Sequence, residues 1–598
     1  MDQLDHLLAQ SAVKACAACF EATVDASQIQ LQQTRKEFEG DRTIVAFPLT
    51  RHSKKSPEET GKAMGEWLVA HDELIEAYQV VKGFLNLTVV PSYWTKELLA
   101  ACNQPAYGLG APRSKPKVMV EYSSPNTNKP LHLGHLRNNF LGYSVARILE
   151  AAGHEVIKVQ IINDRGIHIC KSMVAWQKFG NGETPESTGL KGDKLVGNYY
   201  VAFDRAFKEE VAKLVAGGQT EEDAKKSAPI LLEAQAMLHK WEQGDEEVVA
   251  LWKTMNGWVY EGFGQTYTEM GVDFDKLYYE SDTYLLGKDQ VEAGLEKGVF
   301  FRKEDGSTWI DLSDEGLDEK LLLRKDGTAV YMTQDIGTAI LRYSDFPGLE
   351  RQIYTVGNEQ EYHFKVLFKI LKKLGVEGAE KNHHLSYGMV ELPEGKMKSR
   401  EGTVVDADDL MAEMANTARE MATELGKIED LSESEKARLF KQVGYGALKY
   451  FLLKVSPSKS MMFDPKASVD FIGNTAPFIQ FNYVRANSIL TKCGAAGVTT
   501  EVKEIDAQAW DADELRLIQH GLLWPGTLQT AAEQCDPSVV ANHAYELTKG
   551  FSRWYQDHPI LNEEDLAKRD ARIALTQFVA HQIKSSMALL GIEMPVKM

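Results

Sequence analysis

The chain has 598 residues, of which 26% are charged and 43% hydrophobic, and its formal net charge at pH 7 is −19. A single hydrophobic core stops growing at about 250–300 residues, so we expect three or four domains. The first ten residues lack the basic start and apolar core of a signal peptide, and no apolar run reaches the roughly 18 residues of a membrane span. These features predict a cytoplasmic protein with no membrane segment.

Charge and cysteine content narrow the function classes further. The net negative charge disfavours nucleic-acid binding by the chain as a whole. Residues 441–466, however, contain five lysines and one acidic residue, which leaves a local basic face open. The cysteines are too scattered for a disulfide framework or a paired zinc site, and we predict no metal held by protein side chains. They are Cys16, Cys19, Cys102, Cys170, Cys493 and Cys535.

Residues 1–110 predict a small α/β domain. A helical stretch comes first, and extended runs follow at residues 43–47 and 84–90. Pro91 ends the second run because proline cannot donate to a strand ladder. Between the two runs, residues 57–70 have apolar positions at helical spacing behind an initial proline.

Residues 111–410 predict a parallel-sheet domain of the Rossmann type. An apolar strand at 118–122 precedes a loop, a helix from about Gly134 and a second strand at 156–162. Short strand–helix–strand units of this kind form parallel sheets with right-handed crossovers. The same pattern resumes at residues 353–357 and continues to a strand at 385–392.

A long polar stretch interrupts this pattern, and we expect it to be an insert at about residues 175–330. Within it, Asp305-Gly306 and Asp326-Gly327 each separate two apolar runs, which predicts two hairpins. Nearly everything after residue 406 has helical periodicity. We therefore expect a helical connector at 411–465 and an all-helical domain at 466–598, so the predicted fold class is α/β multidomain.

The first stretch with chemical character, residues 123–135, lies between a predicted parallel strand and its helix. Open sheets bind ligands at this place, and a first helical turn offers unpaired N–H groups to an anion. His132 and His135 add two N–H donors, Lys129 adds positive charge, and Gly134 permits close approach. Together these groups suit a nucleoside triphosphate. A metal-binding histidine pair or a simple helix cap stays open, although no third ligand stands at convincing spacing.

The second such stretch is a basic, glycine-flanked loop at residues 395–403. A loop of this composition can close over phosphates and neutralise the charge that develops on them. A solvated surface loop would have the same composition, so the segment carries little weight alone.

Read together, the two stretches resemble a known pair of signatures. His132-Leu133-Gly134-His135 resembles the HIGH signature of class I aminoacyl-tRNA synthetases, and residues 396–400, KMKSR, resemble their KMSKS signature. They occur in the expected order with a long insert between them. The longer sequence around them is similar to the arginyl-tRNA synthetases in particular, at residues 120–126, 129–130, 132–137, 331–336, 360–364 and 590–592 and at Met598. The similarity covers nearly the whole chain and is weakest in the insert.

The resemblance implies ligation of L-arginine to tRNA(Arg) with ATP, through an arginyl-adenylate and with release of AMP and diphosphate. It also implies magnesium bound with the nucleotide, a monomer, and a first step that requires tRNA. KMSKS has lysine where this chain has Ser399, and Lys129 is implied to supply the missing charge. The residues implied to act on the phosphates are His132, His135, Lys129, Lys396, Lys398 and Arg400, and those implied to bind ATP also include Gly134, Met389 and Met397.

The same sequence segments also give a physical basis for arginine specificity. A guanidinium is a planar fork of five donors that favours carboxylates, whereas a lysine ammonium is a point charge. Tyr331 and Asp335 are four residues apart and share one face if a helix begins there. The resemblance aside, an ordinary helix start is the simpler interpretation of this pair. The residues implied to bind arginine are Tyr331, Asp335 and Gln360 at the guanidinium, and Glu121, Ser124 and Asn126 nearer its backbone end.

Two stretches of the helical region, residues 478–485 and 551–555, interleave aromatic, amide and arginine side chains. Such surfaces suit unstacked bases, and the resemblance assigns this region to the anticodon and the N-terminal domain to the outer corner of tRNA. Packing in a helical core, or in an ordinary strand, stays open for each side chain. The candidates are Phe84, Asn86, Gln480, Phe481, Arg485 and Trp554.

Two other function classes stay open. One is a nucleotidyltransferase that forms an adenylate without tRNA, and the large helical region after residue 406 disfavours it. The other is a tRNA-binding paralogue without activity, which is disfavoured by the intact His132, Gly134, His135, Tyr331 and Asp335.

Overall fold

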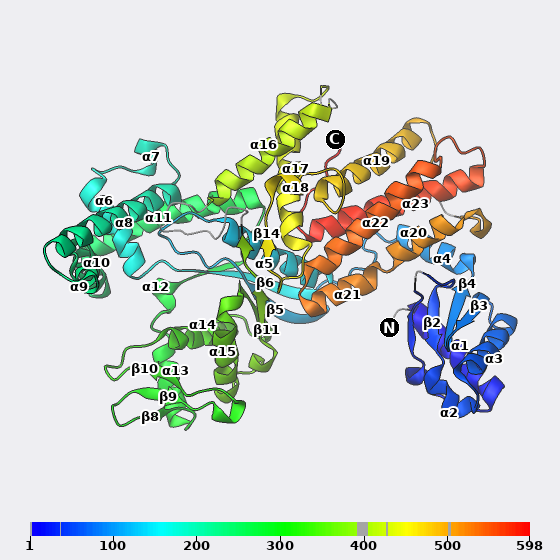
Figure 1. Cartoon of the computed structure of the whole chain (residues 1–598), viewed down its shortest axis with the longest axis horizontal. Coiled ribbons are helices and arrows are strands. Elements are labelled where there is room, and N and C mark those ends of the chain that lie inside the picture. The colour runs from blue at the N-terminus through cyan, green and yellow to red at the C-terminus, as the bar shows by residue number, and fades with distance from the viewer. Residues whose placement is uncertain (1–2, 36, 392–404, 426–428, 500–503) are drawn as a thin grey trace. The chain divides into compact units, whose positions relative to one another are not determined.

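The computed structural model describes residues 3–35, 37–391, 405–425, 429–499 and 504–598. The chain forms two compact units, each assembled from three segments (Figure 1). Unit 1 consists of Met1–Gly108, Arg485–Gly526 and Glu546–Ile583, and unit 2 of Leu109–Val484, Thr527–Tyr545 and Lys584–Met598.

Unit 1 contains a four-stranded antiparallel sheet in the order β1-β2-β4-β3, with α3 packed against β3 and β4 and α1 against α3. The expected extended runs are β2 and β4, and the expected helix behind Pro57 is α3. A capping box between Ser56 and Glu59 starts α3. The elements are α1 (Gln3–Phe20), β1 (Leu31–Gln33), β2 (Arg42–Val45), α2 (Thr50–Ser53), α3 (Pro57–His71), β3 (Ile75–Val81), β4 (Phe84–Val89), α4 (Pro91–Cys102) and α20 (Ala512–Leu522).

Unit 2 is built on a five-stranded parallel sheet in the order β12-β11-β5-β6-β7. The central strand β5 is apolar on both faces, and Val118, Met119 and Val120 are fully buried, as a parallel strand covered on both sides requires. The chain goes from β5 to β6 on one side and later returns to β11 on the other. Open parallel sheets bind ligands at such a reversal, outside the carboxyl ends of the two strands concerned, which here are β5 and β11. The strands are β5 (Lys115–Glu121), β6 (His154–Ile162), β7 (Lys276–Tyr279), β11 (Leu349–Gly357) and β12 (His383–Tyr387).

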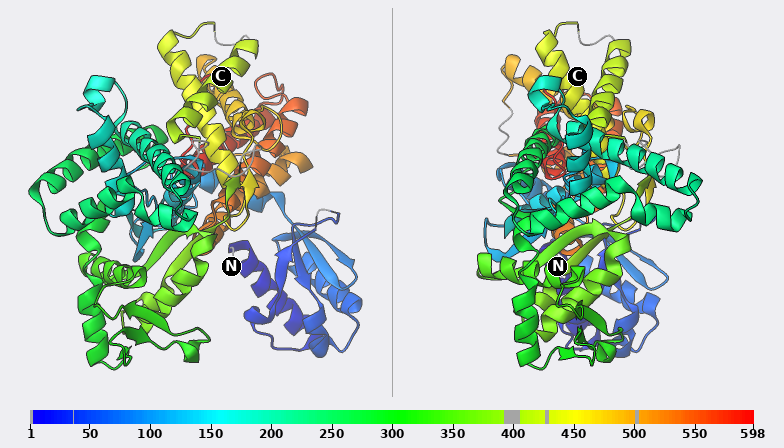
Figure 2. Two further views of the ribbon diagram at one scale, coloured as in Figure 1. Left: turned by 60° about the vertical axis from the view of Figure 1, so that its left-hand side comes forward. Right: turned by 90° about the vertical axis from the view of Figure 1, so that its left-hand side faces the viewer.

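The stretch that we expected to be one insert, residues 175–330, contributes β7 to this sheet. Before β7 come helices that pack on one another and lie side by side in Figures 1 and 2. Strand β7 has only four residues and follows a long helical segment, so its pattern is too short to be recognised in the sequence. The helices are α6 (Ile167–Phe179), α7 (Pro185–Thr188), α8 (Gly192–Ala216), α9 (Glu221–Ser227), α10 (Pro229–Glu242) and α11 (Glu246–Met270).

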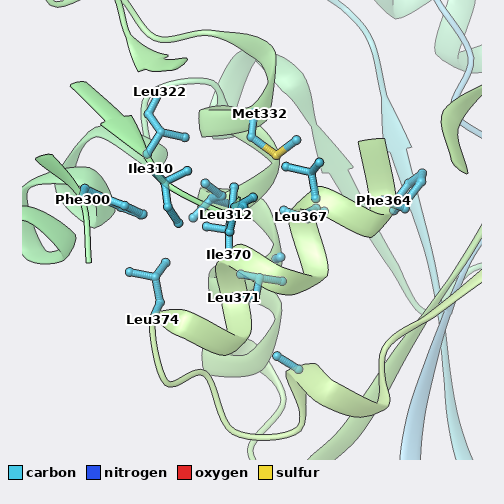
Figure 3. Packing of buried hydrophobic residues seen from close by; sticks show 14 of the residues in the cluster. Phe300, Ile310, Leu312, Leu322, Met332, Phe364, Leu367, Ile370, Leu371 and Leu374 are labelled. Atoms are coloured by element: carbon cyan, nitrogen blue, oxygen red, sulfur yellow. The ribbon is translucent and has the colours of Figure 1, made fainter. Parts of the chain in front are cut away.

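After β7, a small sheet packs against α14 and α15 around one hydrophobic cluster (Figure 3). Ile310, Leu312 and Leu322 meet Leu367 and Ile370 there. The hairpin predicted at residues 305–306 is confirmed between β8 and β9. Residues 326–327 lie between Leu323 and Ala329, which pair only as an isolated antiparallel bridge. The elements are α12 (Glu280–Thr283), α13 (Gly287–Glu296), β8 (Phe301–Arg302), β9 (Thr308–Ile310), β10 (Lys320–Leu323), α14 (Tyr331–Asp345) and α15 (Glu361–Lys373).

The remaining part of the chain is mainly helical, as expected, and the predicted fold class is confirmed. A two-stranded parallel pair, β13 with β14, joins the end of the sheet region to the helices. No helix in the described ranges is long and apolar enough to span a membrane. The elements are β13 (Val390–Glu391), α16 (Ala407–Leu425), α17 (Glu433–Leu453), β14 (Met461–Met462), α18 (Pro465–Ser468), α19 (Ala476–Ala495), α21 (Trp524–Gln534), α22 (Pro537–Asp557) and α23 (Leu566–Leu589).

Helix α5 (Leu133–Ala151) connects β5 to β6 and packs closely on β5 through Gly142. A methyl group at Gly142 would overlap the Tyr122 side chain, which is fully buried. We therefore expect Gly142→Ala to lower the free energy of unfolding by about 1–3 kcal/mol through overpacking. Gly257→Ala, on an open face of α11, is the matched control and should raise it by about 0.5–1 kcal/mol. Urea midpoints measure both, and equal midpoints for the two variants would contradict this packing.

Candidate active site

The carboxyl ends of the parallel strands bring most of the candidate residues to one edge of the sheet. This is the edge at which open α/β sheets bind ligands. Two acids that the sequence did not single out, Asp164 and Glu280, follow β6 and β7 there. The predicted residues Ser124, Asn126, Gln360 and Met389 follow β5, β11 and β12, and Glu121 is the last residue of β5.

The chain leaves β5 through a sharp bend at Ser123, whose φ of 63° lies in the left-handed region. This conformation is unfavourable for a serine, so its surroundings must hold it. The Ser123 N–H donates to Asn138 Oδ1 at 2.6 Å, and its hydroxyl lies 2.7 Å from the Tyr267 hydroxyl. Asn138 Nδ2 in turn donates to the Thr355 carbonyl of β11 at 2.6 Å. The bend is therefore fixed by α5, α11 and β11 together.

His132 caps the N-terminus of α5, and its bonds determine where each imidazole carries its proton. Gly134 N–H donates to His132 Nδ1, and His132 N–H donates to His135 Nδ1, both at 3.1 Å. Because each Nδ1 accepts, a neutral ring keeps its proton on Nε2. The two ring centroids lie 3.9 Å apart. The predicted pair of N–H donors at this turn is thus formed by the two Nε2 atoms.

Both histidines are neutral at physiological pH. Burial, reinforced by the nearby charge of Lys129, lowers the pKa of His132 to about 4. Burial also lowers the pKa of His135 well below its usual value, with His132 and Lys129 adding to the effect. A neutral imidazole with its proton on Nε2 can donate a hydrogen bond to an anion without a further proton.

A metal centre at the histidines has little support. The described residues contain a single group of three potential metal ligands, Asp511, Glu514 and His558 in unit 1. Their bonds within the protein explain that group, because Glu514 pairs with Arg572 at 2.7 Å and Asp511 caps α20 and pairs with His558.

The second signature falls outside the described residues, so the structure does not place Lys396, Met397, Lys398 or Arg400. The segment that precedes it is described. Met389 is half-exposed, and its carbonyl accepts from Arg137 of α5 at 3.4 Å. The buried Arg137 guanidinium also donates to the Pro457 carbonyl at 3.0 Å and the Lys459 carbonyl at 2.8 Å.

The segment that follows is attached to the same turn. Ala407 N–H donates to the Leu131 carbonyl at 2.9 Å, and Asp406 forms an antiparallel bridge with His132. Residues on both sides of 392–404 are therefore held beside the first turns of α5. The residues that flank the second signature thus lie beside the first signature, although about 260 residues of sequence separate the two signatures.

The predicted arginine-binding residue Glu121 is buried and forms an ion pair with the buried Arg342 of α14. The Arg342 guanidinium also lies over the rings of Tyr278 and Tyr354, at 5.1 and 5.6 Å from their centroids. Burial opposes the charge of Arg342, but Glu121 raises the pKa of Arg342. Glu121 is therefore a fixed carboxylate whose orientation Arg342 determines.

Tyr331 and Asp335 lie on one face of α14, which begins at Tyr331 as the spacing predicted. Asp335 Oδ2 lies 2.6 Å from His363 Nε2, and the rings of His363 and Tyr331 are 5.3 Å apart. Burial raises the pKa of Asp335, while its bond to His363 opposes that shift. The Tyr331 side chain is 62% exposed and so is accessible to a ligand.

Glu280 is a further acidic residue of this region, and the sequence reading missed it. It follows β7 directly, and burial raises its pKa, with Asp164 and Asp335 reinforcing and Arg165 opposing the shift. Asp335 is the main cause of the raised pKa of Tyr331, to which Glu121 and Glu280 also contribute. Three acidic residues therefore lie close enough to act on Tyr331, and such surroundings suit a cationic side chain. Recognising β7 in the sequence would have exposed Glu280.

The candidates for tRNA contact differ in exposure. Asn86, Gln480 and Trp554 are buried at 2%, 0% and 3% exposure, and Gln480 donates to two carbonyls of its own chain. Their side chains are structural in this conformation because they offer no surface to a base. The prediction of tRNA contact therefore rests on Phe84, Phe481 and Arg485, which are partly exposed.

Comparison with known families and proteins covers the whole chain. A family model described as "tRNA synthetases class I (R), catalytic domain" matches residues 98–464, and one described as "DALR anticodon binding domain" matches residues 479–598. An arginine–tRNA ligase of Flavobacterium psychrophilum is 54% identical over 606 residues and 100% of both chains. Another, of Parabacteroides distasonis, is 55% identical over 97% of both chains.

Solved structures agree with the sequence relatives. Thermus thermophilus arginyl-tRNA synthetase superposes with a TM-score of 0.79 at 26% identity and covers 100% of both chains. The Plasmodium falciparum arginyl-tRNA synthetase shares the fold, with a TM-score of 0.75 at 18% identity over 100% of both chains. With a catalytic-domain model over most of its length and relatives more than half identical from end to end, this chain belongs to the arginyl-tRNA synthetases, class I enzymes that ligate arginine to tRNA.

Proposed function

We propose that the crevice between β5 and β11 forms arginyl-adenylate and then transfers arginine to tRNA(Arg). In the first step the arginine carboxylate attacks the α-phosphorus of ATP, and diphosphate leaves. In the second step a terminal ribose hydroxyl of tRNA attacks the acyl carbon, and AMP leaves. The observation that supports this assignment is the pair of Nε2–H donors at the start of α5, beside both flanks of the second signature.

The proposed roles at the phosphates follow from charge and position. His132 and His135 donate to phosphate oxygens, and Lys129 supplies the positive charge that the signature lacks at Ser399. Lys396, Lys398 and Arg400 neutralise the leaving diphosphate, while Gly134, Met389 and Met397 contact the nucleotide. Magnesium, bound with the nucleotide, supplies further charge neutralisation; the described residues near the histidines offer no group of three metal ligands.

Arginine is proposed to bind with its guanidinium at Asp335, Tyr331 and Glu280, with Gln360 at the edge of this pocket. Glu121, Ser124 and Asn126 lie at the end of β5 and hold the backbone end of the amino acid. A carboxylate-lined pocket rejects neutral analogues because its charges would otherwise lose their partner. Lysine fits less well because its point charge does not match two carboxylates in a plane.

We further propose that the protein works in the cytoplasm as a monomer. Phe481 and Arg485 are proposed to contribute to anticodon binding, and Phe84 to contact elsewhere on tRNA. The proposed domains are residues 1–110, 111–410, 411–465 and 466–598, and the two matched family models support the division between catalytic and anticodon-binding parts.

Aminoacylation tests the proposed function directly. Purified protein is incubated with labelled arginine, ATP and bulk tRNA, and acid-precipitable label is counted. We expect label to accumulate with arginine and not with lysine or glutamate. Adenylate formation without transfer would instead indicate a nucleotidyltransferase, and tRNA binding without either step would indicate an inactive paralogue.

Substitution of His132 separates the helix cap from the chemistry. Asparagine is a good cap but cannot place a donor where Nε2 lies, so His132→Asn should keep the urea midpoint. We expect ATP–pyrophosphate exchange, measured with arginine and tRNA present, to fall by about 10²–10³-fold. His132→Ala should lose the same activity and also about 1 kcal/mol of stability. Near-normal exchange in the asparagine variant would rule out His132 as a phosphate donor.

Substitution of Asp335 tests recognition of the guanidinium. Asp335→Ala should raise the KM for arginine by roughly tenfold or more, since a hydrogen bond to a charged group contributes about 1.5–3 kcal/mol. The KM for ATP serves as the internal control and should stay within a factor of two or so. An unchanged KM for arginine would remove Asp335 from the pocket.

A further inference from the structure

Asp164 lies at a junction of three elements and takes no part in the chemistry described above. It lies two residues after the end of β6 and is 1% exposed. Its Oδ1 accepts the Ser281 N–H at 2.9 Å, and its Oδ2 accepts the Ser281 hydroxyl at 2.7 Å and the Tyr260 hydroxyl at 2.9 Å. A buried carboxylate so fully bonded has one orientation, and it fixes the groups that donate to it.

Several groups that donate to Asp164 come from one helix, α11. This helix belongs to the helical insert, a name that we use from here on for α7–α11 (residues 185–270) within the longer stretch 175–330. Besides the Tyr260 hydroxyl, Trp252 Nε1 donates to the Asp164 carbonyl at 2.6 Å and Asn256 Nδ2 donates to it at 3.3 Å. Trp252, Asn256 and Tyr260 are spaced four residues apart and so lie on one face of α11. Three successive turns of the insert thus bind a single residue of the sheet edge.

On its other side, Asp164 holds the turn that carries Glu280. Ser281, which donates twice to Asp164, is the next residue in the chain and belongs to α12. The Tyr260 ring also lies 5.2 Å from the ring of Tyr279, the residue before Glu280. The residues on both sides of Glu280 are therefore in contact with Asp164 or with α11: Ser281 through its N–H and hydroxyl, and Tyr279 through its ring.

The neighbouring residue, Arg165, adds a second link from the insert to α12. Its guanidinium lies 3.9 Å from the ring centroid of Tyr284, directly after α12, and 5.6 Å from that of Trp241 on α10. It also pairs with Glu242 of α10 at 3.2 Å. Residues 164–165 therefore connect two helices of the insert to the turn behind Glu280.

We propose that Asp164 is a positioning residue through which the helical insert sets the place of Glu280 and hence the affinity for arginine. The inference rests on the proposed function, in which Glu280 helps to receive the guanidinium. By this route the helical insert contributes to the arginine-binding pocket. A change at Tyr260, which bonds to Asp164 and not to Ser123, then alters arginine binding and leaves the ATP site at α5 unaffected.

The test uses the full chain and compares two tyrosines of the insert. Tyr260→Phe removes the hydroxyl that donates to Asp164. Tyr199→Phe is the matched control because the Tyr199 hydroxyl donates to Glu183 at 2.5 Å, also a carboxylate, without touching Asp164. We expect Tyr260→Phe to raise the KM for arginine about three- to tenfold, with the KM for ATP and kcat within twofold. The control should leave all three constants within twofold.

A double-mutant cycle identifies the route. If the insert acts through Glu280, Tyr260→Phe should have no further effect on the arginine KM in a Glu280→Gln background, because the two changes share one path. Ser281→Ala, which removes one donor to Asp164, should reproduce the KM effect and serves if Tyr260→Phe folds poorly.

Three outcomes overturn the inference: an unchanged arginine KM in Tyr260→Phe, equal effects of Tyr260→Phe and Tyr199→Phe, or additive effects of Tyr260→Phe and Glu280→Gln. Failure of the proposed pocket is distinguishable, since Glu280→Gln by itself would then leave the arginine KM unchanged.

Discussion

The bend at Ser123 is the constraint on which the rest of the site depends. A serine in the left-handed region is unfavourable by itself, at a cost of about 1–2 kcal/mol, and it persists because Asn138 and Tyr267 bond to it from two different helices. Asn138 belongs to α5, so the end of β5 and the helix that His132 caps are tied together at this residue. The two Nε2–H donors and the residues that flank the second signature lie at the first turns of the same helix.

Much of this architecture could be predicted from the sequence, because strong periodicity marks buried parallel strands and their crossover helices. The strand–helix–strand unit around α5 and the start of α14 at Tyr331 are examples. β7 escaped recognition because its four residues show too little periodicity, and Glu280 was missed with it. The partners of Glu121 and Asp335, namely Arg342 and His363, lie 221 and 28 residues away in the chain, and no local pattern reveals such pairs.

The tRNA candidates show a different limit. An amide or indole side chain on a helix can contact bases or pack in a core, and both roles have the same sequence pattern. Gln480 and Trp554 are core residues here, and the Gln480 Nε2 and Trp554 Nε1 groups donate hydrogen bonds inside the protein. The acids Glu121 and Asp335 of the pocket, by contrast, are bonded inside the protein, Glu121 to the Arg342 guanidinium and Asp335 to the His363 ring. Arg342 and His363 thus hold these two acids in place before any substrate arrives.

The helix cap made by His132 couples acidity to structure in an unusual way. Protonation of that imidazole places a hydrogen on Nδ1, the same atom that accepts the Gly134 N–H. Two donors then face each other, and the first turn of α5 loses its cap as the ring gains charge. Since the ring's pKa is depressed to about 4 from an ordinary value near 6.5, this contribution to stability is complete above pH 6.5 and declines as the pH falls towards 4. One proton on His132 would therefore have two effects at low pH: it would remove the cap from the first turn of α5, and it would give the imidazole a positive charge. The helix start and the proposed phosphate contact would then be lost over the same pH range.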